Sequence, residues 1–467
     1  MSAHTTALWT SVEAEAATLG KASRRFEAGG ISIDTRTLKP GDLFVALQGE
    51  ARDGHEFIRA AFEAGAAAAL VSKTPNDLPP DAALLTVAHT QRGLEDLGRA
   101  ARARSHGKVI AVTGSAGKTT TKEMLRLAFG ALGRTHASAA SYNNHWGVPL
   151  TLAAMARESE YAVIEIGMNH FGEIRALSDF ARPHAALVTT IAPAHLEFFG
   201  CCEAIADAKS EIFEHIVPGG AAAIPADSPY ADRLALRARQ AGVSTVLGFG
   251  EKVGSDARLI ARAEMGEGQT IEADILGRRV HIHIGAPGAH IAQNAVGALL
   301  AVAAADGDVL NAAAALSQFA ALKGRGAQFR VRVGEGEATI IDESYNANPA
   351  SMAAALALLG SAPAHGRRIA VLGDMLEMGP EGAAHHAALA KDIEAAGVDL
   401  VFANGAQMQA LWERLPASRR GAYGATSAEI APAVVAAVAA GDVVLVKGSF
   451  GSRMAVVIAA LKAREAQ

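Results

Sequence analysis

One short stretch of the chain, residues 113–120, has the sequence TGSAGKTT and could bind phosphate. Gly114 and Gly117 let backbone N–H groups turn toward phosphate oxygens, and a helix that begins here adds the positive end of its dipole. Lys118 supplies a point charge for the outer phosphates, and the Thr119 hydroxyl can complete the shell of a Mg²⁺ ion. We therefore expect a nucleotide phosphate site made of Gly114, Ser115, Ala116, Gly117, Lys118, Thr119 and Thr120.

The sequence on either side of this loop bears on the interpretation. Val112 occupies the place where the longer phosphate-loop pattern has its first glycine, so a glycine-rich turn with an exposed lysine is the alternative. The β-branched run at residues 109–113 predicts a buried strand, and residues 118–130 predict a helix. Because a strand before and a helix after is the setting in which such loops bind phosphate, we interpret the loop as a nucleoside triphosphate site.

Two other side chains with useful chemistry each come at the end of a predicted strand. Glu165 ends the strand at residues 161–166, and His195 follows the strand at residues 185–191. In a parallel sheet both would face the same crevice as the phosphate loop, where either could hold a second divalent cation. An unpaired carboxylate at a buried strand end is costly, which favours a ligand for Glu165. Taken alone, His195 fits a helix-capping or core histidine equally well.

Lys209 lies in the charged segment DAKSE, residues 207–211, which we predict to be helical. Spacing alone favours a solvated lysine on the outer face of a helix. Nothing in the local pattern gives this lysine a chemical role.

Strands that alternate with alanine-rich helices must position these residues. Short apolar or β-branched runs predict further strands at residues 221–224, 339–341, 368–372, 400–403 and 442–446. Such alternation is typical of parallel sheets covered by helices on both faces, with ligands beyond the carboxyl ends of the strands. The predicted fold class is therefore α/β.

Length and two shifts in composition predict the domain organisation. At 467 residues the chain is too long for one ordinary hydrophobic core. A proline-rich polar segment at residues 74–81 and the sequence KGRG at residues 323–326 mark candidate boundaries. We predict three domains, at residues 1–82, 83–323 and 324–467.

The composition excludes several classes of protein. Apolar residues make up 50% and charged residues 19% of the chain, which is globular rather than disordered. A net charge of −5 without long basic runs argues against nucleic acid as a partner. We expect neither a membrane span nor a signal peptide, because no long apolar run and no basic start before an apolar run occur. With two adjacent cysteines, Cys201 and Cys202, a disulfide framework is not expected, and we predict a soluble cytoplasmic protein.

Motifs spread over nearly the whole chain resemble those of one known family. They are SIDTR at residues 32–36, PGDLFVAL at 40–47, DGH at 53–55, TGSAGKTTTKE at 113–123, NN at 143–144, GVPLTL at 147–152, DESYNANP at 342–349, LGDMLEMG at 372–379 and KGS at 447–449. With these motifs the sequence resembles the Mur ligases of bacterial cell-wall synthesis. Within that family it is most similar to the members that add a D-alanyl-D-alanine dipeptide.

The resemblance implies three domains: a small N-terminal uridine-nucleotide-binding domain, a central P-loop parallel-sheet ATPase domain and a C-terminal Rossmann-like α/β domain. It implies that ATP phosphorylates the terminal carboxylate of UDP-N-acetylmuramoyl-tripeptide. The amine of D-alanyl-D-alanine then attacks the acyl phosphate, and phosphate leaves. The protein is expected to work as a monomer, with no nucleic acid and no membrane as partners.

The resemblance also implies roles for individual residues. Two Mg²⁺ ions would be bound through Thr119, Glu165 and His195, and Lys118 would act on the transferred phosphate. Lys209 matches the family lysine that CO₂ converts to a carbamate, which reverses the interpretation from spacing. The further implied ATP-binding residues are Asn294, Arg325 and Asp342; those for the UDP-linked substrate are Ser32, Thr35, Arg36, Asn143, Asn144, Asn169 and His170; those for the dipeptide are Tyr345, Asn346 and Asn348.

Three alternatives compete with this prediction. The ligase that adds the third amino acid is disfavoured, because its Asp-Asn-Pro-Arg motif is missing while NANP is present at residues 346–349. Folylpolyglutamate synthetase shares the phosphate loop but would lack the uridine domain that residues 32–55 supply. A non-catalytic, nucleotide-gated binding protein would need Lys118 and Thr119 but could dispense with Glu165, His195 and Lys209.

Overall fold

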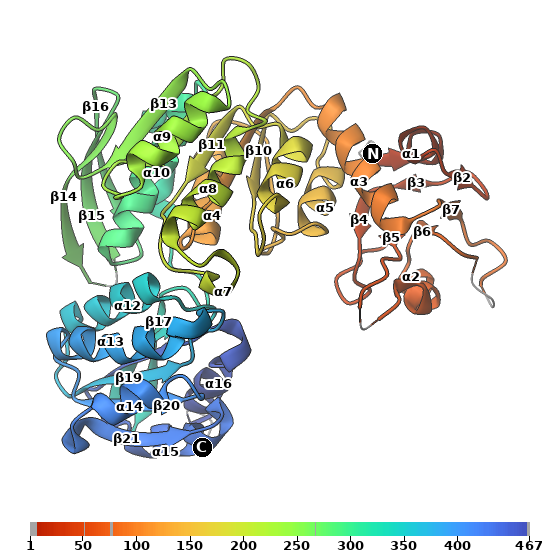
Figure 1. The fold of residues 1–467 in the computed structure, drawn as a ribbon. Coiled ribbons are helices and arrows are strands. Elements are labelled where there is room, and N and C mark those ends of the chain that lie inside the picture. The colour runs from red at the N-terminus through yellow and green to blue at the C-terminus, as the bar shows by residue number, and fades with distance from the viewer. Residues whose placement is uncertain (1–6, 51, 75–77, 267, 465–467) are drawn as a thin grey trace.

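The computed structural model describes residues 7–50, 52–74, 78–266 and 268–464, and these form three α/β domains (Figure 1). The N-terminal domain, red to orange in Figure 1, and the blue C-terminal domain lie against different sides of the central domain. This arrangement confirms the predicted α/β class and the organisation in three domains. Among the described residues, no helix has both the length and the apolar character needed to cross a membrane.

The N-terminal domain contains a five-stranded sheet in the order β2-β7-β6-β5-β4. Strands β4 to β7 pair in parallel, and β2 pairs antiparallel with β7. The strands of this sheet are β2 (Lys21–Ala22), β4 (Gly30–Ser32), β5 (Asp42–Val45), β6 (Ala68–Val71) and β7 (Leu84–Thr86), while β1 (Trp9–Thr10) and β3 (Glu27–Ala28) form a separate antiparallel pair. The helices are α1 (Ser11–Thr18), η1 (Gly54–Phe57), α2 (Ile58–Glu63) and α3 (Thr90–Arg104). Helix α3 packs against helices of the central domain and so joins the two domains.

The first domain boundary differs from the predicted one. Strand β7, residues 84–86, pairs with β6 and β2, so the N-terminal sheet continues past the predicted boundary at residue 82. The proline-rich segment at residues 74–81 connects two neighbouring strands of one sheet, and its residues 75–77 lie outside the described residues. Proline interrupts strands wherever a chain turns, so it marks a loop within this domain as readily as a linker between domains.

The central domain has a nine-stranded sheet in the order β16-β15-β14-β13-β12-β11-β8-β10-β9. Neighbouring strands from β9 to β14 in this order are parallel, whereas β14, β15 and β16 form antiparallel hairpins. The strands are β8 (Lys108–Thr113), β9 (Thr135–Ala137), β10 (Tyr161–Glu165), β11 (Ala185–Val188), β12 (Ala221–Pro225), β13 (Thr245–Gly250), β14 (Ala257–Met265), β15 (Gly268–Ile275) and β16 (Arg278–Ile284).

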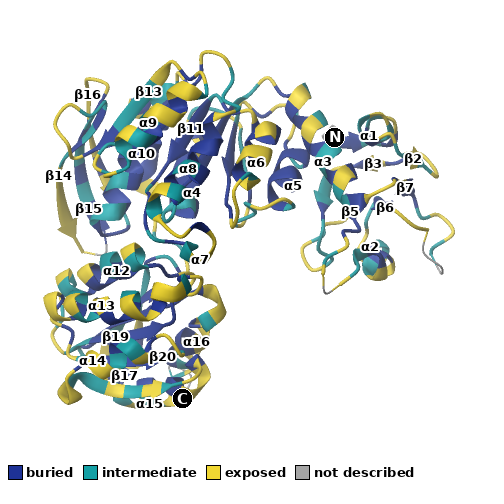
Figure 2. Cartoon of the chain, viewed as in Figure 1, coloured by how far each residue is buried: buried dark blue, intermediate teal, exposed yellow. Residues whose placement is uncertain are grey.

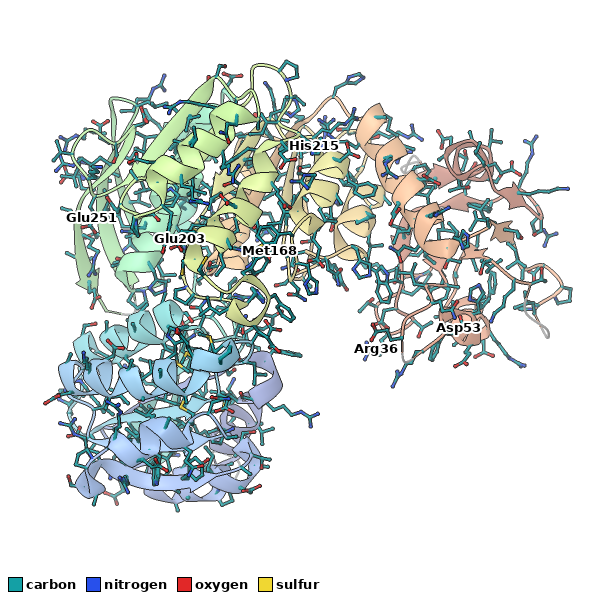
Figure 3. The ribbon with its side chains drawn as sticks, viewed as in Figure 1. Arg36, Asp53, Met168, Glu203, His215 and Glu251 are labelled. Atoms are coloured by element: carbon teal, nitrogen blue, oxygen red, sulfur yellow. The ribbon has the colours of Figure 1, made fainter. Side chains whose placement is uncertain are left out.

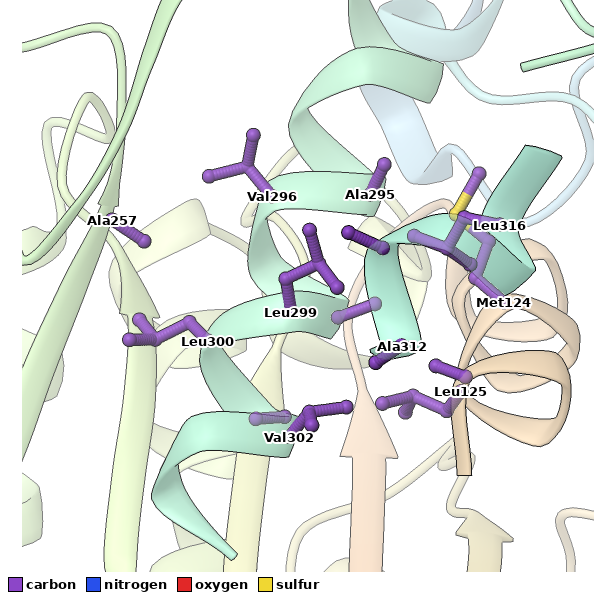
Figure 4. Close-up of a cluster of buried hydrophobic side chains, with 14 of the residues drawn as sticks. Met124, Leu125, Ala257, Ala295, Val296, Leu299, Leu300, Val302, Ala312 and Leu316 are labelled. Carbon is purple, nitrogen blue, oxygen red and sulfur yellow. The ribbon is translucent and has the colours of Figure 1, made fainter. Parts of the chain in front are cut away.

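Helices cover both faces of the central sheet, and the strands between them are buried (Figure 2). On one face, α4 and α10 pack together with α11 over side chains such as Leu125 and Leu299 (Figure 4). The other face is covered mainly by α5, α6, α8 and α9. The helices are α4 (Lys118–Gly130), α5 (Gly147–Ala153), α6 (Glu173–Ala181), α7 (Leu196–Phe199), α8 (Cys202–Ser210), η2 (Glu211–Phe213), α9 (Ala231–Gln240), α10 (Ala289–Ala304), α11 (Val309–Ala315) and η3 (Leu316–Gln318).

The C-terminal domain has a six-stranded sheet in the order β17-β18-β22-β19-β20-β21, parallel except for β17. One face is covered by α12, α13 and α14 and the other by α15 and α16. The strands are β17 (Ala327–Val333), β18 (Gly336–Glu343), β19 (Arg368–Gly373), β20 (Leu400–Asn404), β21 (Arg420–Gly424) and β22 (Val443–Lys447). The helices are α12 (Pro349–Ser361), η4 (Gly379–Glu381), α13 (Gly382–Ala395), α14 (Gln409–Arg414), η5 (Ala417–Arg419), α15 (Ser427–Ala437), η6 (Phe450–Ser452) and α16 (Ala455–Ala463).

Every strand expected from an apolar run is present, within a few residues of its predicted ends, and α4 spans residues 118–130 as predicted. The hairpins β14 to β16 were not expected. In β16 buried side chains alternate with exposed ones, because only one face of this edge strand meets the core. That alternation differs from the continuous apolar runs of the doubly covered parallel strands.

Candidate active site

The phosphate loop joins the end of β8 to the start of α4 and requires glycine at two positions. Gly114 has φ +151°, and a Cβ there would lie 1.8 Å from the Thr189 hydroxyl oxygen. Gly117 has φ +80° and precedes the first turn of α4, and a Cβ there would lie 2.9 Å from both amide atoms of Asn294. The backbone therefore approaches its neighbours too closely for a side chain, as expected of a loop that presents N–H groups to an anion.

Lys118 begins α4, and its Nζ donates a hydrogen bond to the Gly114 carbonyl at 2.8 Å. Burial lowers the pKa of Lys118, the negative charge of Glu165 opposes that shift, and the positive charge of Arg325 adds to it. A partly desolvated ammonium bound only to a backbone carbonyl can be stabilised further by phosphate. This lysine is thus placed where an anionic ligand would offset the unfavourable burial of its charge.

Glu165 is 1% exposed, and one of its two oxygens is well satisfied. Its Oε1 accepts hydrogen bonds from the Thr119 hydroxyl at 3.2 Å and the Asn143 amide at 2.7 Å. The Thr119 oxygen in turn lies 2.9 Å from the Ser141 hydroxyl, which donates to it. The other carboxylate oxygen, Oε2, is buried without a hydrogen-bond partner among the described residues.

That buried, unpartnered oxygen fits a divalent cation. Within the part of the chain that the structure describes, no three carboxylate, imidazole or thiol side chains gather into a metal site. Mg²⁺ does not need such a cage, because it is commonly held by one or two protein oxygens together with phosphates and water. Glu165 and Thr119 supply two oxygens of that kind beside the phosphate loop.

His195 lies at the start of α7 in the left-handed region, with φ +56°. Its Nδ1 lies 2.5 Å from a carboxylate oxygen of Glu377, which belongs to the C-terminal domain. The carboxylate has no proton to give, so Nδ1–H donates and Nε2 is the nitrogen left to bind a cation. This hydrogen bond holds the pKa of Glu377 below its usual value. Sequence reasoning missed Glu377, because its partner is 182 positions away and only its membership in the motif at residues 372–379 marked it.

Lys209 lies in the last turn of α8 and is 1% exposed. The interpretation from spacing, a solvated lysine, is therefore wrong, since the apolar face of this helix turns into the core. Burial lowers the pKa of Lys209 well below its ordinary value, and the positive charge of Lys118 lowers it further. Lys209 is therefore a buried amine next to the positive charge of Lys118.

A cavity of about 910 Å³ lies between the central and C-terminal domains and brings most predicted residues together. Lining it are Ser115, Ala116, Gly117, Lys118, Thr119, Thr120, Asn143, Asn144, Glu165, Asn169, His170, His195, Asn294, Arg325, Tyr345, Asn346 and Asn348. Of the other predicted residues, Gly114 and Lys209 are buried and do not line the cavity, and Asp342 is buried in the C-terminal domain. Ser32, Thr35 and Arg36 lie in the N-terminal domain.

Residues from the C-terminal domain reach the phosphate loop directly. Asn348 accepts a hydrogen bond from the Ser351 backbone as the cap of α12, and its Nδ2 donates to the Ser115 carbonyl at 3.1 Å. The Arg325 guanidinium lies 4.1 Å above the centre of the Tyr345 ring. The first contact crosses between domains and the second lies within the C-terminal domain, so Asn348, a predicted dipeptide residue, also links the two domains.

Further ionisable groups in the cavity wall, Lys447, Glu343 and His290, were not predicted. Lys447, at the end of β22, donates to a Glu343 carboxylate oxygen at 3.2 Å and to the Asn346 carbonyl at 2.9 Å. His290 lines the same part of the cavity, and burial lowers its pKa. Glu343 and Lys447 both lie within motifs of the sequence, but their pairing depends on β18 and β22 being neighbours.

Asp342 uses its carboxylate within the protein. One oxygen accepts from the Gly324 backbone at 3.1 Å, and the other accepts from the Ser344 backbone at 3.1 Å and the Ser344 hydroxyl at 2.5 Å. These bonds fix the chain immediately before Arg325. A direct contact of Asp342 with the nucleotide stays a prediction.

The predicted uridine residues form a turn after β4 in the N-terminal domain. Ser32 donates to the Asp34 carbonyl at 3.0 Å, and Arg36 pairs with the Asp34 carboxylate, lowering the pKa of that carboxyl. Figure 3 labels Arg36 on the N-terminal domain and Met168, which lines the cavity, on the central domain. Asn144 accepts a hydrogen bond from the backbone of Gly147, the first residue of α5, at 2.9 Å. The residues predicted to bind the UDP-linked substrate therefore form two groups, one on the N-terminal domain and one at the cavity in the central domain.

The site defines a multidomain P-loop enzyme. It combines a phosphate loop, a buried carboxylate with one unpartnered oxygen, and a second α/β domain that lines the same cavity. Three family models match the chain: the catalytic domain of the Mur ligase family at residues 27–125, the Mur ligase middle domain at 112–302 and the Mur ligase glutamate ligase domain at 329–450. The chain belongs to the Mur ligase family.

Individual relatives resemble the chain over nearly its whole length. UDP-N-acetylmuramoyl-tripeptide–D-alanyl-D-alanine ligase of Rickettsia prowazekii is 32% identical over 447 residues, covering 96% of this chain and 98% of the relative. The Escherichia coli enzyme of that name is 36% identical and covers 92% and 93%. A crystal structure of MurF from Acinetobacter baumannii has a TM-score of 0.84 at 31% identity, covering 97% and 99%. That of MurF from Thermotoga maritima in complex with ADP has a TM-score of 0.77 at 26% identity, covering 94% and 98%.

Proposed function

We propose that this protein is an ATP-dependent ligase that joins D-alanyl-D-alanine to UDP-N-acetylmuramoyl-tripeptide in peptidoglycan precursor synthesis. The observation that carries the proposal is the cavity in which the phosphate loop meets the open oxygen of Glu165 and the C-terminal domain. The relatives that carry this name match all three domains, and the ADP complex of the Thermotoga maritima enzyme supports ATP as the energy source. The reaction would run in the cytoplasm on a monomer.

The phosphate loop would bind the ATP phosphates through the N–H groups before α4, and Asn294 would lie on the nucleoside side. Lys118 and Arg325 would place positive charge on the transferred phosphoryl group from opposite domains, because both line the cavity. Thr119 and Glu165 would hold one Mg²⁺, and Glu165 with His195 a second. Bound there, Mg²⁺ would supply charge neutralisation between the phosphates and the substrate carboxylate.

The reaction begins between two anions, the carboxylate of the tripeptide and the γ-phosphate of ATP. An oxygen of the tripeptide's terminal carboxylate attacks the γ-phosphorus, and ADP leaves. The D-alanyl-D-alanine nitrogen then attacks the acyl carbon, loses a proton and expels phosphate. Tyr345 and Asn346 would orient the dipeptide, while Asn143, Asn144, Asn169 and His170 would hold the muramoyl end and Ser32, Thr35 and Arg36 the uridine end. Positioning, rather than a covalent enzyme intermediate, carries such a reaction.

Lys209 is proposed to carry a carbamate. Its lowered pKa favours the uncharged amine, which is the form whose nitrogen attacks CO₂ and releases a proton. The anion formed would offset the positive charge of Lys118, which lies close enough to lower the pKa of Lys209. Lys209→Ala should lose most turnover and regain part of it with added short carboxylates. Full turnover without any carboxylate would refute the carbamate.

The proposed reaction is tested by phosphate release with ATP, UDP-N-acetylmuramoyl-tripeptide and D-alanyl-D-alanine, omitting each in turn. We expect steady release only when all three are present, with ADP and amide product in equal amounts. The ligase that adds the third residue would instead act on UDP-N-acetylmuramoyl-dipeptide with an added diamino acid. Release that ignores the dipeptide would overturn the proposal.

A further inference from the structure

The contact between His195 and Glu377 joins two domains at the edge of the cavity. His195 follows β11 of the central domain, and Glu377 follows β19 of the C-terminal domain. Their side chains are 2.5 Å apart, with 24% of the histidine side chain and 42% of the glutamate side chain exposed. An ion pair at the rim of a protein contributes little stability on its own, so stability alone is a weak reason for this pairing.

The backbone at both residues is held in a conformation that non-glycine residues avoid. The φ angles are +56° at His195 and +61° at Glu377. Each costs on the order of 1 kcal/mol, so the surroundings must impose both. Strain of this kind is commonly found where a side chain is aimed for a purpose.

Contacts between the same two turns impose that geometry. The Glu197 backbone donates to the Glu377 carbonyl at 3.1 Å. Gly379 has φ +65°, and a Cβ there would lie 3.2 Å from the Glu197 Cα, so the turns pack backbone against backbone. Leu196, between His195 and Glu197, packs against the buried clusters of both domains. Figure 1 shows α7 at this junction.

A carboxylate that accepts a hydrogen bond from Nδ1 prepares an imidazole to bind a metal ion through Nε2. It fixes the ring orientation, keeps the proton on Nδ1 and directs the Nε2 lone pair outward. The other proposed cation ligand, Glu165, is fixed differently, by Thr119 and Asn143 within the central domain. One half of the proposed cation site is therefore built by the central domain alone, and the other half is aimed by the C-terminal domain.

We propose that Glu377 is a positioning residue that aims His195 at the second cation, so that this cation binds fully only when the C-terminal domain is docked. The inference rests on the metal role of His195 in the proposed function. It assigns the coupling between domain docking and cation binding to one hydrogen bond that crosses the two domains. The first cation, at Thr119 and Glu165, does not depend on it.

The test counts Mn²⁺ ions bound to the full-length protein, by electron paramagnetic resonance and calorimetry, with the imido analogue of ATP and UDP-N-acetylmuramoyl-tripeptide present. The variants are Glu377→Ala, which removes the acceptor, and Glu377→Gln, which keeps an oxygen for Nδ1–H. Glu381→Gln is the matched control, because Glu381 lies in η4 nearby and its side chain is 82% exposed. Thermal melting checks that each variant folds.

We expect two Mn²⁺ ions in the parent protein and in Glu381→Gln. Glu377→Ala should weaken the second ion by about 10–100-fold and leave the first unchanged, as losses of such supporting carboxylates do. Glu377→Gln should fall between them. Unchanged binding of the second ion in Glu377→Ala, or equal loss of both ions, would overturn the positioning role of Glu377 but leave the proposed function standing. A parent that binds a single ion would refute the metal role of His195 and the inference with it.

Discussion

Replacing Glu165 by glutamine should make the metal-free protein more stable and the metal-bound protein less stable than the parent. The glutamine Oε1 can still accept from Thr119 and Asn143, so the two existing hydrogen bonds survive. The change removes a negative charge that is 1% exposed and whose second oxygen has no partner among the described residues. A functional carboxylate kept at some cost in stability is the expected situation at a cation site.

The size of each effect can be estimated. The glutamine Nε2 would lack a partner where Oε2 now lies, at about 1–3 kcal/mol, so the gain comes only from burying a neutral amide in place of a charged carboxylate. The attraction between Glu165 and Lys118 offsets part of that, since the glutamate charge raises the pKa of the lysine. We therefore expect a gain of about 1 kcal/mol without metal, or roughly 2–4 °C for a domain of about 150–250 residues. In the parent, metal at about 100 times its dissociation constant should add about 2.7 kcal/mol, most of which the variant should lose.

The assay is thermal unfolding with the nucleotide analogue present, first in a chelator and then in saturating Mg²⁺. The order of the two melting temperatures should reverse between these conditions. Glu173→Gln is the matched control, because Glu173 is an exposed carboxylate that lines the same cavity. That variant should show neither the gain nor the loss. A Glu165→Gln protein with the parent's full Mg²⁺-dependent rise would refute the metal role of Glu165.

Three further perturbations probe other parts of the structure. Lys118→Ala should lower turnover at least ~10²-fold because a charge contact to the transferred phosphate disappears. Steady-state phosphate release measures the turnover, and a near-normal rate would contradict the role of Lys118. Gly117→Ala should raise the KM for ATP and destabilise the protein by about 1–2 kcal/mol, because Gly117 has φ +80°. Gly130→Ala, at the last residue of the helix that follows Gly117, has open space at its Cβ and should do neither; equal effects in the two variants would count against the loop geometry. His184 accepts a hydrogen bond from the Val109 backbone, and burial, with help from nearby cations, lowers its pKa to about 4 from 6.5. Only the unfolded chain binds a proton on His184 between those two pKa values, so the free energy of unfolding should be full above pH 6.5 and fall by about 1–2 kcal/mol by pH 5. Urea unfolding measured across this pH range would show the fall. His184→Asn should flatten the pH dependence, and an unchanged pH dependence in that variant would refute the role of His184.

The phosphate loop could be predicted because all the groups that would bind phosphate come from consecutive residues of the chain. Gly114, Gly117 and Lys118 act through neighbouring backbone groups and one helix end, so their order in the chain already fixes their arrangement. The strand ends at Glu165 and His195 could be predicted for a similar reason. Parallel strands in a doubly covered sheet are continuous apolar runs, and a polar residue that ends such a run must emerge at the ligand-binding edge.

Other features depend on contacts between segments far apart in the chain. Lys209 looked solvated because its neighbours are charged, and only the packing of α8 buries it. The β14 to β16 hairpins carried a usable signal, since the alternation of buried and exposed residues in β16 is visible as alternating apolar and polar letters. Glu377 carried no such signal, because what it does depends on a histidine in another domain.

The cross-domain contacts act on one connected piece of the central domain. Ser115 of the phosphate loop donates to the Ala192 carbonyl at 2.9 Å and accepts from the Ala192 backbone at 3.0 Å, so the loop is tied to the segment that carries His195. Asn348 donates to the Ser115 carbonyl, and Glu377 contacts His195. A movement of the C-terminal domain must therefore be felt at the phosphate loop and at His195 together. These short ties couple the loop end at Ser115 and the His195 turn to docking of the C-terminal domain, whereas the hydrogen bonds from Thr119 and Asn143 hold Glu165 within the central domain alone.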